Sequence, residues 1–190
     1  MKAAEGFQKY SLFLVFCFIL VSLSCASSNW WDDPPQMEGK ITAVGMARYV
    51  GNDTLSRTAA EANAKRVLAG FVKTQIQALT ETWGKQAGND QVASSVSNYF
   101  NDENITRDLI NTTLHGAIPL KYAKHGKYQY VLMAIDTKKF AQYWKNAASK
   151  ALEAKKVLLQ SQAMKEDYAK RMDKIIEEYL ARVAKGIAAK

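Results

Sequence analysis

The chain has two cysteines, and they lie in different surroundings. Cys17 lies within an apolar run, whereas Cys25 follows that run and precedes a polar stretch with two consecutive prolines. A thiol at such a boundary can stay free, pair in a disulfide or carry a covalent modification. The chemistry of Cys25 therefore depends on what becomes of the segment before it.

The other reactive side chains are too few or too loosely held to form a catalytic centre. His115 and His125 have no cysteine and no run of carboxylates nearby that would complete a metal site or activate a nucleophile. Asp32 and Asp33 are adjacent, but a proline-punctuated segment cannot hold two carboxylates at a fixed separation. We therefore expect a protein that is not an enzyme and that uses no metal and no cofactor.

Residues 1–24 have the composition of an export signal. They begin with basic residues and continue into an apolar core of about fourteen residues that ends in small residues. That core is shorter than the roughly 20 residues a membrane-spanning helix needs. Cleavage after Ser24 would remove Cys17 and make Cys25 the first residue. An exported chain with a single cysteine cannot form an internal disulfide, which favours modification of Cys25.

The stretch VSLSC resembles a bacterial lipobox, although Ser22 stands where an aliphatic residue is typical and Leu23 follows one position late. The resemblance implies that Cys25 carries acyl chains such as palmitate and anchors the protein in a membrane. Ala26, in place of aspartate, resembles the sequence of lipoproteins that are sorted to the outer membrane. Ordinary secretion with a free thiol and an uncleaved anchor are the alternatives.

Residues 25–38 are expected to be a lipidated tether, because they are polar and contain two prolines but no apolar periodicity. Trp30 and Trp31 follow the predicted lipid closely. Indole rings favour the membrane interface, so these two residues are expected either to lie there or to pack on the protein's own surface.

The positive charge is concentrated toward the end of the chain. Residues 25–136 carry 11 basic and 11 acidic side chains, whereas residues 137–190 carry 13 basic and 6 acidic side chains. A basic surface favours a polyanionic partner. Nucleic acid is not expected, because the predicted signal exports the protein.

The residue pattern predicts an α+β fold. A strand is expected over residues 41–50, a long helix from Asp53 or Thr54 to Trp83 or Gly84, and a weaker helix over residues 91–100. The predicted architecture is a small, roughly three-stranded antiparallel sheet packed by one long and one shorter helix, followed by a long C-terminal helix.

The second half of the chain is predicted as a hairpin and a helix. Residues 108–136 are rich in β-branched and aromatic residues on both sides of Gly126, which indicates two strands joined by a turn. From Thr137 to Lys185 the chain has neither proline nor glycine, which predicts one helix of about fifty residues, either straight or kinked near residues 160–162. We expect an α+β domain over residues 39–140 and a basic amphipathic helix over residues 141–190.

Residues 39–140 resemble the twenty-kilodalton bacterial outer-membrane lipoprotein family, which includes FlgP-like flagellar lipoproteins and the N-terminal domain of FlgT. The similarity lies in GKITAVGMARYVGNDTLSRTAAEANAKRVLAGFVKTQI and in KYQYVLMAIDTKKF, where the matching residues are Gly45, Ala59, Ala62, Ala64, Arg66, Leu68, Tyr130 and Asp136. The resemblance implies an exported helix-on-sheet domain, with some members assembling into rings or discs around the flagellar motor. The basic C-terminal helix is not part of the shared region.

A weaker similarity covers NDTLSRTAAEANAKRV, which resembles the peptidoglycan-binding pattern of OmpA-like domains. That pattern has an arginine three residues after the serine, whereas here Arg57 directly follows Ser56. Peptidoglycan is therefore kept as a possible ligand rather than a preferred one.

The predicted core combines one face of the long helix with the sheet. Its expected members are Val44, Leu68, Val72, Ile76, Val131, Met133 and Ile135. The alanines at positions 59, 60, 62, 64 and 69 are expected to let the helix approach the sheet closely.

An apolar stripe follows the last fifty residues at helical spacing. A fifty-residue helix would span about 75 Å, so part of it would project from the domain and need a partner. The residues expected to bind that partner are Tyr168, Met172, Ile176, Tyr179 and Val183.

Two function classes follow from these features. The preferred one is a non-enzymatic outer-membrane lipoprotein with a structural or assembly role in the cell envelope, as a homo-oligomer or in an envelope complex such as a flagellar ring or disc. The alternative is an envelope binding module that recognises a polyanion such as peptidoglycan or lipopolysaccharide.

Overall fold

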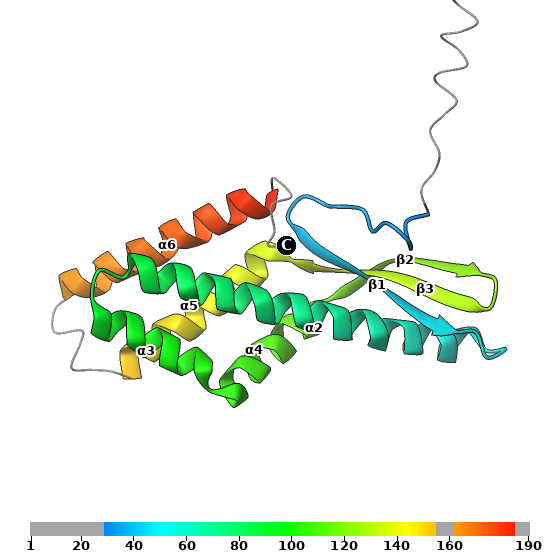
Figure 1. Cartoon of the computed structure of the whole chain (residues 1–190), viewed down its shortest axis with the longest axis horizontal. Coiled ribbons are helices and arrows are strands. Elements are labelled where there is room, and N and C mark those ends of the chain that lie inside the picture. Colours follow the sequence, from blue (N-terminus) through cyan, green and yellow to red (C-terminus); the bar gives the residue numbers. More distant parts are fainter. Residues whose placement is uncertain (1–28, 155–161, 185–190) are drawn as a thin grey trace, which may run out of the picture. The chain divides into compact units, whose positions relative to one another are not determined.

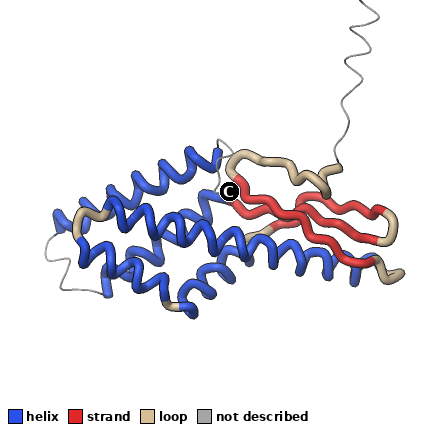
Figure 2. Tube along the Cα trace, viewed as in Figure 1, coloured by secondary structure: helices blue, strands red, loops and turns tan. Residues whose placement is uncertain are grey.

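The computed structural model describes residues 29–154 and 162–184. The chain from Pro34 onward forms one compact unit, and residues 29–33 are the described part of a separate N-terminal unit. Figure 1 labels the elements of the compact unit, and Figure 2 shows its strands side by side with one long helix running along them. The elements are β1 (Lys40–Arg48), α2 (Asp53–Gln86), α3 (Asp90–Asn101), α4 (Glu103–His115), β2 (Ile118–His125), β3 (Tyr128–Asp136), α5 (Thr137–Ala154) and α6 (Gln162–Ala184).

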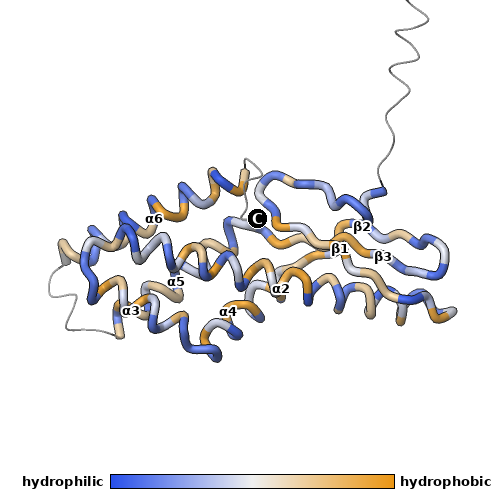
Figure 3. Tube along the Cα trace, viewed as in Figure 1, coloured by the Kyte–Doolittle hydropathy of each residue, from blue (hydrophilic) through white to orange (hydrophobic). Residues whose placement is uncertain are grey.

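The three strands form one antiparallel sheet in the order β1-β3-β2. The turn between β2 and β3 contains Gly126, whose φ of 56° lies in the left-handed region that glycine adopts without steric cost. Hydrophobic residues concentrate where β1 and β3 run together (Figure 3). The predicted α+β class, the three-stranded antiparallel sheet and the hairpin turn are confirmed.

Helix α2 packs along the sheet through small residues in its first half and larger ones after them. Ala60 and Ala64 are fully buried, as are Leu68 and Val72 one and two turns later. Asn52 caps the start of this helix, since its side chain accepts a hydrogen bond from the Leu55 amide. The buried residues recur every four positions, so one narrow face of α2 forms the core.

The predicted packing role of the alanines holds only in part. Ala60 and Ala64 are buried, whereas Ala59 and Ala62 are exposed. Leu55, Val67 and Phe71, which share helical spacing with the two exposed alanines, are exposed as well. Apolar residues lie on both faces of α2, and the sheet covers only one of them.

The strands present alternate residues to α2. Ala43 pairs with Met133 and Gly45 with Val131, and all four face the core. Val44 is only half-buried, because successive strand residues point to opposite faces. The prediction that Val44 lies in the core is therefore wrong, whereas the other six predicted core residues are buried.

Residues 108–115 form the second half of helix α4 rather than the start of a strand. The side chain of Asp102 accepts a hydrogen bond from the Asn104 amide and caps this helix. Leu109 and Thr113, one turn apart, are the buried residues of α4. An N-cap and a buried helical face outweigh the strand preference of isoleucine and threonine here.

The predicted single helix of about fifty residues is wrong, because α5 and α6 run antiparallel to each other. Phe140 near the start of α5 meets Tyr179 near the end of α6, with ring centroids 5.9 Å apart. Farther along α5, Lys145 forms an ion pair with Asp173, and the Ser149 hydroxyl lies 3.8 Å from the Met172 sulfur. The partners on α6 move backwards as the position on α5 advances, so α6 returns along α5.

The apolar stripe of α6 lies inside this unit. Tyr168, Met172 and Tyr179 are buried, and Ile176 and Val183 pack against the same core. Tyr168 contacts Trp83 of α2, with ring centroids 6.2 Å apart. The expectation that these five residues project toward a partner is therefore wrong, because α2 and α5 already cover them.

The Leu68→Ala substitution should lower the free energy of unfolding by about 2 to 5 kcal/mol, because Leu68 is fully buried between α2 and the sheet. The neighbouring Val67 is 45% exposed and serves as a matched control. Val67→Ala should change the free energy by less than about 0.5 kcal/mol. Denaturant unfolding of both variants measures the difference, and equal losses would mean that α2 does not pack as described.

Candidate functional site

The strongest predicted site, Cys25, lies outside the described residues, and so does Cys17. The described part of the N-terminal unit includes Trp30 and Trp31, whose rings meet edge to face with centroids 5.6 Å apart. Lipidation of Cys25 stays a prediction.

Ser56 and Arg57, which carry the weak similarity to a peptidoglycan-binding pattern, serve the fold. The Ser56 hydroxyl donates to the Asn52 carbonyl oxygen at 2.7 Å and accepts from the Val50 amide at 3.2 Å. The Arg57 guanidinium lies 5.1 Å from the centre of the Tyr122 ring. Ser56 is almost completely buried, so it is not placed to meet a ligand.

A small polar cluster links α2 to strand β2. The Tyr122 hydroxyl donates a hydrogen bond to the Glu61 carboxylate, and Arg57 lies over the same ring. Burial, followed by the hydrogen bond and the negative charge of Glu61, raises the pKa of Tyr122 to about 12, and Arg57 opposes this shift. The phenol therefore stays protonated at neutral pH, and the cluster positions β2 on α2 rather than supplying a base.

An open groove of about 760 Å³ lies between helices α2, α3 and α4. Its apolar lining comes from Ile76, Phe100 and Ile110, one residue from each helix. The Phe100 ring stacks on the ring of Trp144 of α5, with the ring centroids 5.8 Å apart. The polar lining consists of Lys73, Gln77, Thr80, Glu81, Ser97, Asn101, Glu103, Thr106 and Arg107.

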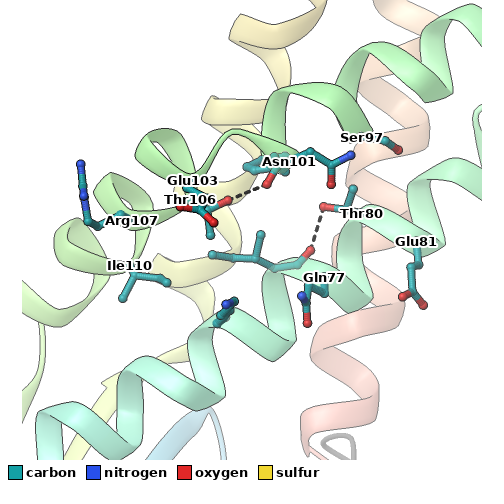
Figure 4. Close-up of a pocket in the computed structure, with 12 residues that line it drawn as sticks. Gln77, Thr80, Glu81, Ser97, Asn101, Glu103, Thr106, Arg107 and Ile110 are labelled. Carbon is teal, nitrogen blue, oxygen red and sulfur yellow. Dashed lines mark hydrogen bonds between the residues drawn. The ribbon is translucent and has the colours of Figure 1, made fainter.

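Several of these polar groups are already engaged by the protein. The Thr80 hydroxyl donates to the Ile76 carbonyl, and the Thr106 hydroxyl donates to the Phe100 carbonyl. Figure 4 shows Asn101 and Thr106 together where α3 meets α4, with Glu81 and Arg107 at opposite margins. The polar groups thus ring the groove without converging on one point.

The charged side chains that line the groove are balanced, with Lys73 and Arg107 on one side of the count and Glu81 and Glu103 on the other. Among the described residues, no group of three or more metal-ligating side chains comes together. The balanced charge also gives the groove no preference for a polyanion.

The groove could not be predicted from the sequence, because one of its walls is α4 and the residue pattern predicts a strand over residues 108–115 of that helix. Lys73, Gln77 and Thr80 recur at helical spacing on α2, and this pattern could have indicated a polar face. The opposite wall could not be placed without recognising α4.

The basic side chains of α6 are matched by an equal number of acidic ones, and Arg171 forms hydrogen bonds within the protein. Arg171 donates to the Gln86 and Ala87 carbonyl oxygens at 3.1 and 3.4 Å and pairs with Asp167. It thereby caps the end of α2, where carbonyl groups lack helical partners. Residues 162–184 carry five basic and five acidic side chains, so this helix has no net charge. A helix without net charge is not expected to bind a polyanion strongly.

The two histidines occupy unrelated places. His115 is the last residue of α4, not a strand residue, and His125 ends strand β2 as predicted. Neither lines the groove. The two histidines therefore do not form a common binding site.

No helix in the described part of the chain has both the length and the hydropathy needed to cross a bilayer. Comparison with protein-family models, curated proteins and solved structures finds no match to this chain. The resemblance to the outer-membrane lipoprotein family therefore stays a prediction that rests on the matching residues of β1, α2 and β3.

Proposed function

We propose that this chain is a non-enzymatic lipoprotein of the bacterial outer membrane, anchored by acyl chains on Cys25, with a structural or assembly role in the cell envelope. The observation that carries the proposal is the position of Cys25, which follows an apolar leader and would be the only cysteine of the mature chain. Its place nine residues before Pro34, where the compact unit begins, is consistent with a short tether. A role in a flagellar ring or disc rests on the family resemblance alone.

The described structure supports a scaffold more than a binding module for a polyanion. Its groove has balanced charges, its last helix has no net charge, and Arg171 is engaged in capping α2. The alternative, recognition of peptidoglycan or lipopolysaccharide by the basic C-terminal helix, draws little support from these observations. Assembly must then use another surface, because the stripe of α6 packs into the core of the compact unit.

The Cys25→Ala substitution should release the protein from membranes, because acyl chains attached through the thiol would provide the anchor. Intact mass should show a wild-type chain that begins at Cys25 with added acyl mass, and membrane fractionation should show the loss in the variant. Cys17→Ala is the matched control and should leave both measurements unchanged. A mature chain with a free thiol that stays in the soluble fraction would overturn the proposal.

A further inference from the structure

The sheet has one face that α2 covers and one that it does not. The second face, which we call the outer face, contains Val44, Met46, Ile118, Lys121, Tyr130 and Leu132, which the strand register places side by side. None of these residues belongs to the core cluster that the described helices share, although Leu132 is buried and Val44 is half-buried. Met46 is 45% exposed and Ile118 is 52% exposed, and these are high values for apolar residues of this size.

The sheet also carries a net positive charge. Residues 40–48 and 118–136 carry five basic side chains and one acidic side chain. Lys40, Arg48 and Lys121 alternate with the core-facing residues and so belong to the outer face. Apolar residues bordered by cations match the chemistry of an anionic membrane surface, where each cation near the surface contributes about 1 kcal/mol.

The chain enters the compact unit at this same face. The Thr42 hydroxyl, on the outer face of β1, donates to the Pro35 carbonyl at 3.1 Å. Pro35 is ten positions after Cys25, which allows a reach of at most about 35 Å. A lipid on Cys25 would therefore keep the outer face close to the bilayer.

We propose that the outer face of the sheet docks on the headgroups of an anionic bilayer, with Met46 and Ile118 as apolar contacts and Arg48 and Lys121 as cationic ones. This inference rests on the proposed lipid anchor. Because α2 lies on the other side of the sheet, docking would leave the helices and the groove facing away from the membrane.

The test uses the lipidated full chain in vesicles of phosphatidylethanolamine and phosphatidylglycerol. A Met46→Cys variant carries an environment-sensitive fluorophore, and acrylamide serves as a neutral aqueous quencher. Val67→Cys is the matched control, because Val67 is also 45% exposed but lies on α2. Quenching at position 46 should fall about threefold relative to phosphatidylcholine vesicles, whereas quenching at position 67 should not change.

Charge variants measure how much the two cations contribute to docking. Arg48→Gln and Lys121→Gln should each lower the ratio of docked to free protein by about fivefold, since each cation contributes about 1 kcal/mol. Equal quenching at position 46 in both kinds of vesicle would overturn the proposal. Protection of position 46 in detergent that increases with protein concentration would also overturn it, because a second copy would then occupy the face.

The labelling stoichiometry separates failure of this inference from failure of the lipid anchor. Lipidation consumes the thiol of Cys25, so the Met46→Cys variant should take one label per chain. Two labels per chain would overturn the anchor and, with it, the premise of docking. One label per chain without protection would overturn the docking alone.

Discussion

Replacing Gly45 with alanine should lower the free energy of unfolding by about 3 kcal/mol, and replacing it with valine should prevent folding. Gly45 lies on β1 directly beneath α2. A methyl group at this position would overlap the Ala60 carbonyl oxygen and the Ala64 amide nitrogen and would lie 2.7 Å from the Ala64 methyl carbon. Two of these three groups are backbone atoms, so no change of rotamer can relieve the overlap.

The cost is large because the contact between helix and strand is fixed on both sides of Gly45. The Asn63 side-chain amide donates to the Met46 carbonyl oxygen at 2.7 Å, and Ala60 and Ala64 are fully buried. Moving α2 away from β1 would break that hydrogen bond and open the packing of Leu68 and Val72 farther along the helix.

Denaturant unfolding of Gly45→Ala measures this cost, with Gly70→Ala as the control. Gly70 lies in the same helix, and no atom comes within 4 Å of a methyl group placed there. Because alanine favours the helix over glycine, Gly70→Ala should raise the free energy of unfolding by up to about 1 kcal/mol. A Gly45→Ala variant as stable as the wild type would mean that α2 is not in contact with β1 at this point.

The parts of the fold that could be predicted are those specified by local signals. The turn at Gly126 needs a positive φ, and Gly51 and Asn52 mark the boundary between β1 and α2. These features depend on one or two residues each, so a single sequence is enough to recognise them.

The buried face of α2 could be predicted only in part. Leu68, Val72 and Ile76 are buried as expected, but the other apolar residues of the helix point in several directions. Leu55, Val67 and Phe71 continue a helical pattern as well as Leu68 and Val72 do, yet only the latter two are buried. Which pattern becomes the core depends on where β1 and β3 lie, and local spacing carries no information about that.

The candidate site divides in the same way. Cys25 can be proposed from its immediate neighbours, whereas the groove depends on three helices, and the residue pattern predicts a strand for the second half of one of them, α4. The stripe of α6 was correctly recognised as apolar but was assigned to an external partner. The segment from Thr137 to Lys185 contains neither glycine nor proline, so no turn-forming residue of these two types marks the reversal that lets α5 and α2 cover the stripe.

Replacing Met172 with glutamate should therefore unfold the compact unit rather than merely separate it from a partner. Met172 is 1% exposed, beside Ser149 of α5, and it lies one turn from Tyr168, which contacts Trp83. A carboxylate buried there without a partner should cost more than about 4 kcal/mol, which approaches the whole stability of many domains. Circular dichroism and denaturant unfolding would show the loss of cooperative structure.

Two controls separate burial from charge and from helix propensity. Ala169→Glu places the same carboxylate on the exposed face of α6 and should change the free energy of unfolding by less than about 0.5 kcal/mol. Met172→Leu keeps the volume and apolar character and should cost less than about 1.5 kcal/mol. If Met172→Glu instead folded like the wild type while its native mass fell, the stripe would be an interface between chains. In that case, assembly in the envelope would use α6. If instead Met172→Glu unfolds the protein while both control variants stay folded, α6 is the helix that completes the core.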